Sequence, residues 1–192
     1  KTKITIFERI TTLINDVDKR DNFAKALVSH LATFDFEDAF QQTYDFFSTI
    51  FEYLIKDYNK DGGGKYAEYY TPRSVASIMA RLLVPDTANI HNVTCYDPSA
   101  GSGTLLMALA HQIGVERCQI YSQDISQKSS QMLRLNLILN QLVKSIQNIV
   151  KGDTLLEPAH KGQDGSLKKF DYIVSNPPFN LDFSDTRDKI AT

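Results

Sequence analysis

Five residues near the end of the chain, Ser175-Asn176-Pro177-Pro178-Phe179, combine side chains suited to chemistry at an amino group. Two successive prolines fix two φ angles and keep the preceding residue out of the helical region, so the segment should project rigidly. The Asn176 side-chain oxygen and a backbone carbonyl of the proline pair can accept hydrogen bonds from an exocyclic amine, and Phe179 can stack on an extruded base. The alternative is a rigid turn with an ordinary capping asparagine.

A second motif, Asp97-Pro98-Ser99-Ala100-Gly101-Ser102-Gly103, lies where a predicted strand ends and a helix begins. Glycines at such a turn let the backbone approach a ligand and direct amides toward it, although a tight turn alone also needs glycine. No third glycine follows at dinucleotide spacing, which argues against a pyrophosphate site. We expect a ligand to be bordered by Asp97, Ala100, Gly101, Ser102 and Gly103.

Two further carboxylates follow predicted strands. Asp124 comes about 20 residues after the glycine turn, where an acidic side chain can accept hydrogen bonds from both hydroxyls of a ribose. Asp153 follows the next strand, where it can accept a hydrogen bond from the exocyclic amine of an adenine ring. Taken singly, Asp124 also fits a solvated strand-end charge and Asp153 an ordinary turn. Because ligands of open α/β sheets lie at the carboxyl ends of the strands, both should line one crevice with Asp97.

The elements that must position these motifs alternate in type, as a parallel sheet with helical crossovers requires. Thr71 before Pro72 predicts a capped start for a helix from Arg73 to Leu83. The segment Glu157–Lys169 is polar and predicts an exposed loop. Strands are predicted over Val93–Tyr96, Gln119–Ser122, Asn148–Val150 and Phe170–Val174, and helices over Thr104–Ile113 and from a Ser126 cap to Asn140.

The first sixty residues have a different, helical pattern. Apolar residues recur at steps of three and four from Phe36 to Tyr58, with earlier stripes through Ile4–Ile14 and through Phe23, Leu27 and Leu31. Three successive glycines then predict a linker. We expect a helical domain over residues 1–60, a glycine linker over 61–66 and a partial α/β domain over 67–192. The chain starts without methionine and ends without an obvious stopping structure, so we interpret it as a fragment.

Composition narrows the function classes. The chain has 192 residues, 21 basic and 23 acidic, and a formal charge of -2, so no global positive field can hold a polyanion. Cys95 and Cys118 are expected to be buried free thiols in a reducing cytosol. With no membrane-length apolar run and no signal-peptide core, we expect a cytoplasmic protein. No role is assigned to four histidines without metal-ligand spacing, His30, His91, His111 and His160.

Four motifs resemble those of gamma-type amino-methyltransferases and follow the same order. They are the D-P-x-x-G-x-G loop, Asp124, Gly152-Asp153-Thr154 and the N-P-P-F motif. The segment Glu68–Arg73 is similar to the one that covers the methionine end of S-adenosylmethionine in that family. With the helical domain and the linker, the chain resembles the methylation subunits of type I restriction-modification systems. This sequence departs from the family's pattern at three places. The family usually has Cys or Ala at the position of Ser99 and Glu at the position of Asp124. At the chain end, the family's sheet continues for three more strands.

The resemblance implies a Rossmann-like methyltransferase fold and transfer of a methyl group from S-adenosylmethionine to N6 of a flipped adenine in duplex DNA. It implies a specificity subunit, a second methylation subunit and a restriction subunit as partners, and no metal. Its catalytic positions are Asn176, Pro177, Pro178 and Phe179. Its cofactor positions are Tyr70, Thr71, Pro72, Arg73, Asp97, Ala100, Gly101, Ser102, Gly103, Asp124 and Asp153.

Other functions fit the same residues. One is a stand-alone adenine methyltransferase or a fused restriction-methylation enzyme. Another is a non-catalytic module that assembles partner subunits and binds cofactor as an allosteric ligand. A third is a protein or RNA amino-methyltransferase with the same motif. Lys168 and Lys169 could touch DNA or form a solvated loop, and Arg73 could reach a phosphate, the cofactor carboxylate or only solvent. The near-neutral charge favours dependence on a separate specificity subunit.

Overall fold

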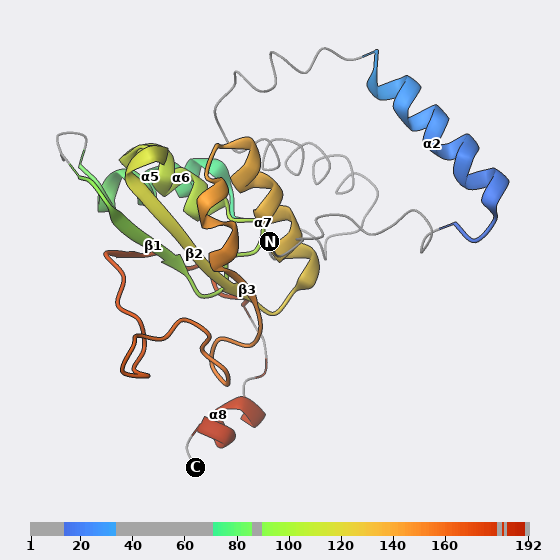
Figure 1. Cartoon of the computed structure of the whole chain (residues 1–192). Coiled ribbons are helices and arrows are strands. Elements are labelled where there is room, and N and C mark those ends of the chain that lie inside the picture. The colour runs from blue at the N-terminus through green and yellow to red at the C-terminus, as the bar shows by residue number, and fades with distance from the viewer. Residues whose placement is uncertain (1–13, 34–70, 86–89, 180–181, 183, 191–192) are drawn as a thin grey trace. The chain divides into compact units, whose positions relative to one another are not determined.

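The computed structural model describes residues 14–33, 71–85, 90–179, 182 and 184–190 (Figure 1). The stripes predicted over 4–14 and 36–58, the linker at 61–66 and Tyr70 lie outside them, except for Ile14. Contacts divide the chain into two units, Lys1–Thr43 and Tyr44–Thr192. The elements are α2 (Val17–Leu31), α5 (Arg73–Leu83), β1 (Val93–Asp97), α6 (Thr104–Ile113), η3 (Val115–Arg117), β2 (Cys118–Asp124), α7 (Gln127–Leu139), η4 (Val143–Asn148), β3 (Ile149–Lys151), β4 (Tyr172–Ile173) and α8 (Ser184–Ile190).

Four parallel strands form one sheet in the order β3-β2-β1-β4. The chain first moves outward from β1 through α6 to β2 and through α7 to β3, and then returns past both strands to β4. The direction of strand addition therefore reverses between β1 and β4. In open α/β sheets ligands bind at the carboxyl ends of the strands at such a reversal. The predicted α/β class with a parallel sheet is confirmed.

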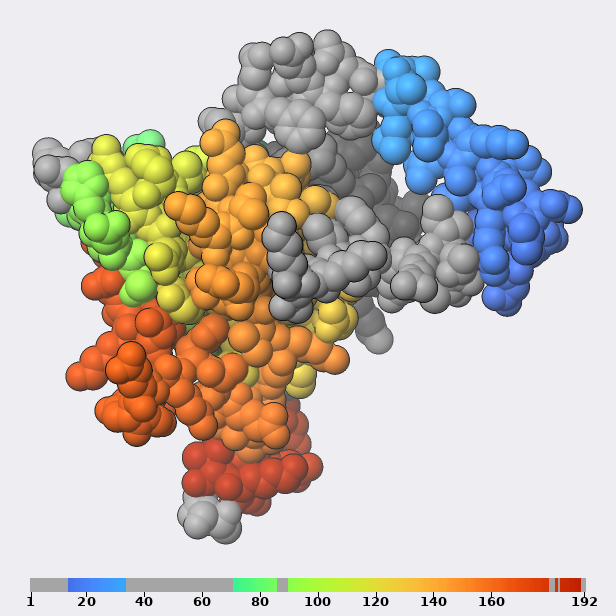
Figure 2. Space-filling view, viewed as in Figure 1, coloured from blue at the N-terminus to red at the C-terminus, as the bar shows by residue number. Residues whose placement is uncertain are grey.

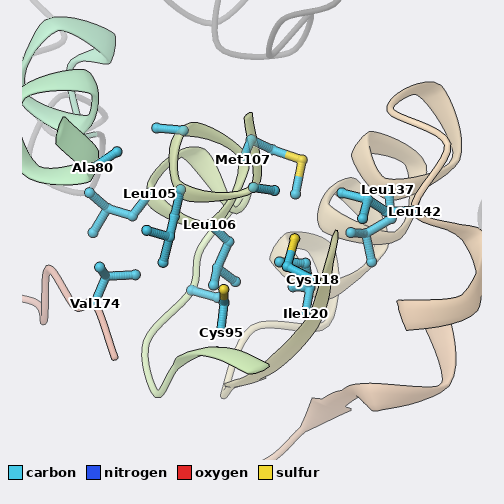
Figure 3. Close-up of a cluster of buried hydrophobic side chains, with 14 of the residues drawn as sticks. Ala80, Cys95, Leu105, Leu106, Met107, Cys118, Ile120, Leu137, Leu142 and Val174 are labelled. Carbon is cyan, nitrogen blue, oxygen red and sulfur yellow. The ribbon is translucent and has the colours of Figure 1, made fainter. Parts of the chain in front are cut away.

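One face of this sheet is covered by α5, α6 and α7 (Figure 1). Helix α6 is apolar along almost its whole surface and is buried except at His111 and Gln112. Figure 3 shows Leu106 close to Cys95 of β1, and Leu105 between Ala80 of α5 and Val174, which follows β4. Full burial of one leucine side chain contributes about 2 kcal/mol. The core thus connects α5, α6 and the ends of β1 and β4.

The other face is covered by the connection between β3 and β4. The Phe170 ring stacks on Tyr96 of β1 with centroids 4.4 Å apart, and His160 meets both Tyr96 and Tyr121 edge to face. The Lys168 ammonium lies 4.9 Å from the Tyr121 ring centroid. Figure 2 shows this segment, in orange, as a continuous surface. The stretch predicted as an exposed loop therefore also covers two strand side chains, Tyr96 and Tyr121, which are half-buried.

Within Lys1–Thr43, α2 begins at an Asp16 cap, whose carboxylate accepts hydrogen bonds from the amides of Asp18 and Lys19. The predicted stripe at Phe23, Leu27 and Leu31 lies on this helix, and all three residues are exposed. Among the described residues, none of the helices has the length and apolarity to cross a membrane.

Most predicted elements of the α/β part agree with the structure, including α5, α6 and the Ser126 cap of α7, whose hydroxyl accepts from the Ser129 amide. The predicted cap at Thr71 is wrong: the cap of α5 is Pro72, which has no side-chain donor or acceptor. Strand β4 is shorter than predicted, because prolines follow it and the Asp171 carboxylate accepts a hydrogen bond from the Thr94 amide.

Cys95 and Cys118 are both free and buried, as predicted. They lie on the neighbouring strands β1 and β2. A hydrogen bond with the Cys118 thiol, together with burial, raises the pKa of the Cys95 thiol. Because the thiolate is the reactive form, Cys95 is a core residue without nucleophilic character at neutral pH.

Candidate active site at the carboxyl ends of the strands

The glycine loop after β1 and the Asn-Pro-Pro-Phe loop after β4 lie side by side, because β1 and β4 are neighbouring parallel strands. The Ser99 and Ser175 hydroxyl oxygens, 76 positions apart in sequence, are 2.8 Å apart. The loops after β2 and β3 reach the same edge. The structure therefore brings together the described residues predicted from all four strand ends.

The glycine turn has two glycines with different surroundings. Gly103 has φ +89° and adjoins α6; a Cβ there would lie 2.2 Å from the Leu133 Cδ1 atom of α7. Gly101 has φ +54°, and a Cβ there would meet no atom within 4 Å. Gly103 thus serves helix packing, whereas Gly101 borders open space next to the end of β1.

Asp97, the last residue of β1, is hydrogen-bonded to this turn. Its side chain is 1% exposed, and Oδ1 accepts a hydrogen bond of 2.9 Å from the Ser99 amide. Burial raises the pKa of the Asp97 carboxyl to about 7; the Ser99 hydrogen bonds oppose the rise and the charge of Asp124 adds to it. The structure therefore gives Asp97 an internal partner within the loop where the sequence predicted a ligand contact.

Asp124, at the end of β2, is tied to the same turn. Its Oδ2 accepts from the Gly101 amide at 2.8 Å, and its Oδ1 accepts from the Ser126 amide at 2.7 Å. Each carboxylate oxygen has two lone pairs, so both retain capacity to accept a further hydrogen bond. The carboxylate is thus fixed in position at the rim of the turn.

The loop after β3 is held by hydrogen bonds of Asp153 and of Thr154, which follows it. The Asp153 Oδ1 atom accepts from the amides of Leu155 and Leu156. The Thr154 hydroxyl donates to the Pro98 carbonyl at 2.6 Å, which ties this loop to the turn after β1. Sequence reasoning missed this role of Thr154, although its place beside Asp153 in the Gly-Asp-Thr motif is a signal that could have indicated it.

The predicted catalytic loop is held at two points. Ser175 contacts Ser99, and the Asn176 Nδ2 atom donates a hydrogen bond of 2.9 Å to the Thr71 hydroxyl. Asn176 is half-buried, whereas the Phe179 side chain is 72% exposed. Neither Ser175 nor Ser99 was assigned a role from the sequence, and no local pattern indicates their pairing.

Three predicted cofactor positions remain. Ala100 is buried, and its amide donates to the Gln123 carbonyl. The Ser102 carbonyl accepts from the Asn136 side chain at 3.1 Å. Arg73, at the start of α5, is half-buried. The first two therefore act through the backbone in holding the turn against β2 and α7.

A cavity of about 530 Å³ is lined by residues of β2, of β3 and of the loop that follows β3. It includes the buried side chain of Gln123, whose Nε2 donates to the Glu157 carbonyl and whose Oε1 accepts from the Ala159 amide. Neither Gly101 nor Asn176 lines it. The cavity is lined by Gln123, Val150, Lys151, Gly152, Leu156, Glu157, Pro158, Ala159 and Lys161.

The residues at the end of β1 and β2 fit a nucleoside-containing cofactor. Open space borders Gly101, and the Asp124 carboxylate beside it is fixed with lone pairs to spare for ribose hydroxyls. Among residues 14–33, 71–85, 90–179 and the other described positions, there is no cluster of three His, Cys, Asp or Glu side chains able to hold a metal ion.

Comparisons with curated proteins show which proteins this chain is similar to. The chain is 26% identical over 83% of its length to the type I restriction enzyme MpnII methylase subunit of Mycoplasma pneumoniae, and covers 30% of that protein. It is 32% identical over 72% of its length to the MjaVII methylase subunit of Methanocaldococcus jannaschii, and covers 22% of it. The chain thus spans less than a third of these curated relatives.

A solved structure shares the fold. The type I restriction-modification system methyltransferase subunit from Streptococcus thermophilus matches with a TM-score of 0.70 and 24% identity, over 98% of this chain and 38% of that one. The family model described as N-6 DNA Methylase matches residues 42–191, which include all four strands and both motif loops. The chain therefore belongs to the N-6 DNA methylase family.

Proposed function

We propose that this chain carries the cofactor-binding and catalytic loops of a site-specific DNA adenine-N6 methyltransferase, the modification subunit of a type I restriction-modification complex. The observation that carries the proposal is the contact between the loops after β1 and β4, where Ser99 and Ser175 meet at 2.8 Å. Family membership and the curated relatives support it. Duplex DNA, a specificity subunit, a second methylation subunit and a restriction subunit are the partners proposed from those relatives.

The cofactor proposed for the site is S-adenosylmethionine, which supplies an activated methyl group on a sulfonium when bound. Asp124 would hold the ribose hydroxyls, and the Gly101 turn would leave room for the nucleoside. Asp153 would accept from the adenine amine. The segment from Tyr70 to Arg73 would cover the methionine end.

The chain's own contribution to transfer is positioning of the acceptor amine. Asn176 Oδ1 and a carbonyl of Pro177 or Pro178 would each accept one N–H of the target amine, which draws its nitrogen toward tetrahedral geometry and concentrates the lone pair. No proline amide competes as a donor. Phe179 is exposed and would stack on the flipped base. Acceptors fixed before the reaction favour the positive charge that develops on the nitrogen.

Reciprocal substitutions test this division of roles. Methyl transfer to duplex DNA is measured with the chain and a candidate specificity subunit, and S-adenosylmethionine affinity by isothermal titration. Asn176→Ala should lower transfer by about 100-fold or more with cofactor affinity retained. Asp124→Ala should weaken cofactor binding by about tenfold, the equivalent of one or two hydrogen bonds. Normal turnover by the Asn176 variant would refute the assignment, and Gln163→Ala in an exposed loop serves as the control.

A further inference from the structure

The Thr71 hydroxyl has a partner that lies 105 positions away in the chain. The Asn176 Nδ2 atom donates to Thr71 Oγ1 at 2.9 Å, and both side chains are half-buried. The hydroxyl does not cap α5, because the cap residue is Pro72 and the helix has no side-chain cap bond. Thr71, which the sequence predicted as the cap of a helix, thus contacts the proposed catalytic loop.

A carboxamide presents its oxygen and its nitrogen at opposite corners of one plane. Rotation about its last torsion is broad and roughly two-fold, so an unrestrained Asn exchanges the two ends readily. An Nδ2 donor engaged by Thr71 leaves Oδ1 directed away from Thr71. The reverse orientation would present N–H groups to the N–H groups of an amine, which repel each other.

The backbone of the same loop is held independently. Ser175, the preceding residue, contacts Ser99 through its hydroxyl at 2.8 Å, and the Val174 amide donates to the Tyr96 carbonyl at 3.0 Å. Thr71 therefore contributes little to the path of the loop. Its specific effect is on the orientation of one side chain.

Thr71 is itself held by the cofactor side of the fold. It lies next to Pro72, the cap of α5, whose Ala76 and Ala80 are buried in the core that α6 shares. The N-cap of helix α6 is Gly103, the last residue of the glycine turn. A continuous set of packed elements thus joins the cofactor loop to the amide of Asn176 through Thr71.

We propose that Thr71 is a positioning residue that sets the Asn176 amide with its oxygen toward the target amine. The inference rests on the proposed function and assigns the Thr71 hydroxyl to Asn176, whereas the resemblance assigned this position to the cofactor. Its neighbours Tyr70 and Arg73 keep the cofactor assignment.

The test compares Thr71→Val, which keeps the shape and removes the hydroxyl, with Thr71→Ser, which keeps the hydroxyl. Ser74→Ala, at an exposed position of α5, is the matched control. In heteronuclear NMR of the 192-residue chain, the Asn176 side-chain amide pair is assigned as the one missing from Asn176→Ala. Thr71→Val should shift this pair and raise its exchange with water about fivefold, the equivalent of one hydrogen bond. Thr71→Ser should restore both values.

The rate of methyl transfer and the affinity for S-adenosylmethionine supply the second readout. In the complex that methylates DNA, Thr71→Val should lower kcat about tenfold and change S-adenosylmethionine affinity less than twofold. An Asn176 amide that does not respond to Thr71→Val, or a loss confined to cofactor affinity, would overturn the positioning role. Failure of the proposed function has a different signature: the amide responds to Thr71→Val as expected, whereas Asn176→Ala transfers methyl groups normally.

Discussion

The loops after β1 and β4 lie side by side and are held in different ways. The loop after β1 is tied internally, through Asp97 to Ser99, and externally, through Asp124 to Gly101. The loop after β4 follows a strand of two residues and ends in an aromatic ring that is 72% exposed. Ser175 and Asn176 supply its side-chain bonds to the rest of the structure. The proposed cofactor side is thus built into the core, while the proposed catalytic side ends at the surface.

This difference separates two kinds of mutational effect. Changes in the turn after β1 should alter the free energy of unfolding, because that turn packs against α6 and α7. Changes at the tip of the loop after β4 should alter transfer and leave stability unchanged. Unfolding in urea, measured beside transfer for each variant, tests the separation.

The largest loss of stability is expected for Gly103→Ala. A Cβ there meets Leu133 Cδ1 at 2.2 Å and φ is +89°, so the variant should lose about 3 kcal/mol or more of unfolding free energy. Gly165→Ala is the matched control, since it has φ +79° and no atom within 4 Å of the new Cβ; it should cost about 1 kcal/mol. Equal losses in both variants would show that backbone strain, and not packing, limits position 103.

Asp97→Asn should change the free energy of unfolding by an amount that depends on pH. Burial raises the pKa of Asp97 to about 7 in the folded protein, above its ordinary value of 3.8, so the folded state holds the proton more tightly than the unfolded state. The wild type therefore loses stability as pH rises from about 4 to about 7, and the loss is complete above that pH.

The asparagine variant has no proton to lose and can still accept from the Ser99 amide. Its advantage in unfolding free energy over the wild type should grow across that pH window to about 4 kcal/mol and then stay constant. Urea unfolding at pH 5, 6, 7 and 8 measures this difference. A difference that is the same at every pH would place the charged form of Asp97 in a solvated site.

Phe179→Ala should have the smallest effect on stability, within about 0.5 kcal/mol, because the ring is largely exposed. It should nevertheless weaken binding of duplex DNA with a mismatched target base, since stacking on an aromatic ring contributes about 1–3 kcal/mol per base. Fluorescence of 2-aminopurine at the target position reports the extruded base. A large loss of unfolding free energy would show that the loop after β4 is part of the core.

Local patterns in the sequence were sufficient to predict the α/β class, the bounds of α5 and α6 and the four strand-end motifs. Such features depend on apolar periodicity and turn residues within about ten positions. The sequence did not indicate that the Thr71 hydroxyl bonds to Asn176, that Ser99 meets Ser175, or that His160 and Phe170 cover the open face of the sheet.

The first two of these contacts join residues 105 and 76 positions apart, and they depend on the strand order β3-β2-β1-β4. The sequence pattern at the end of a strand does not depend on which strand becomes its neighbour in the sheet. Strand pairing is decided instead by which apolar faces of strands and helices can be buried together. The motifs and their chemistry were therefore determined locally. Their meeting at one edge of the sheet was decided by tertiary packing, because only the reversal between β1 and β4 places the two loops side by side.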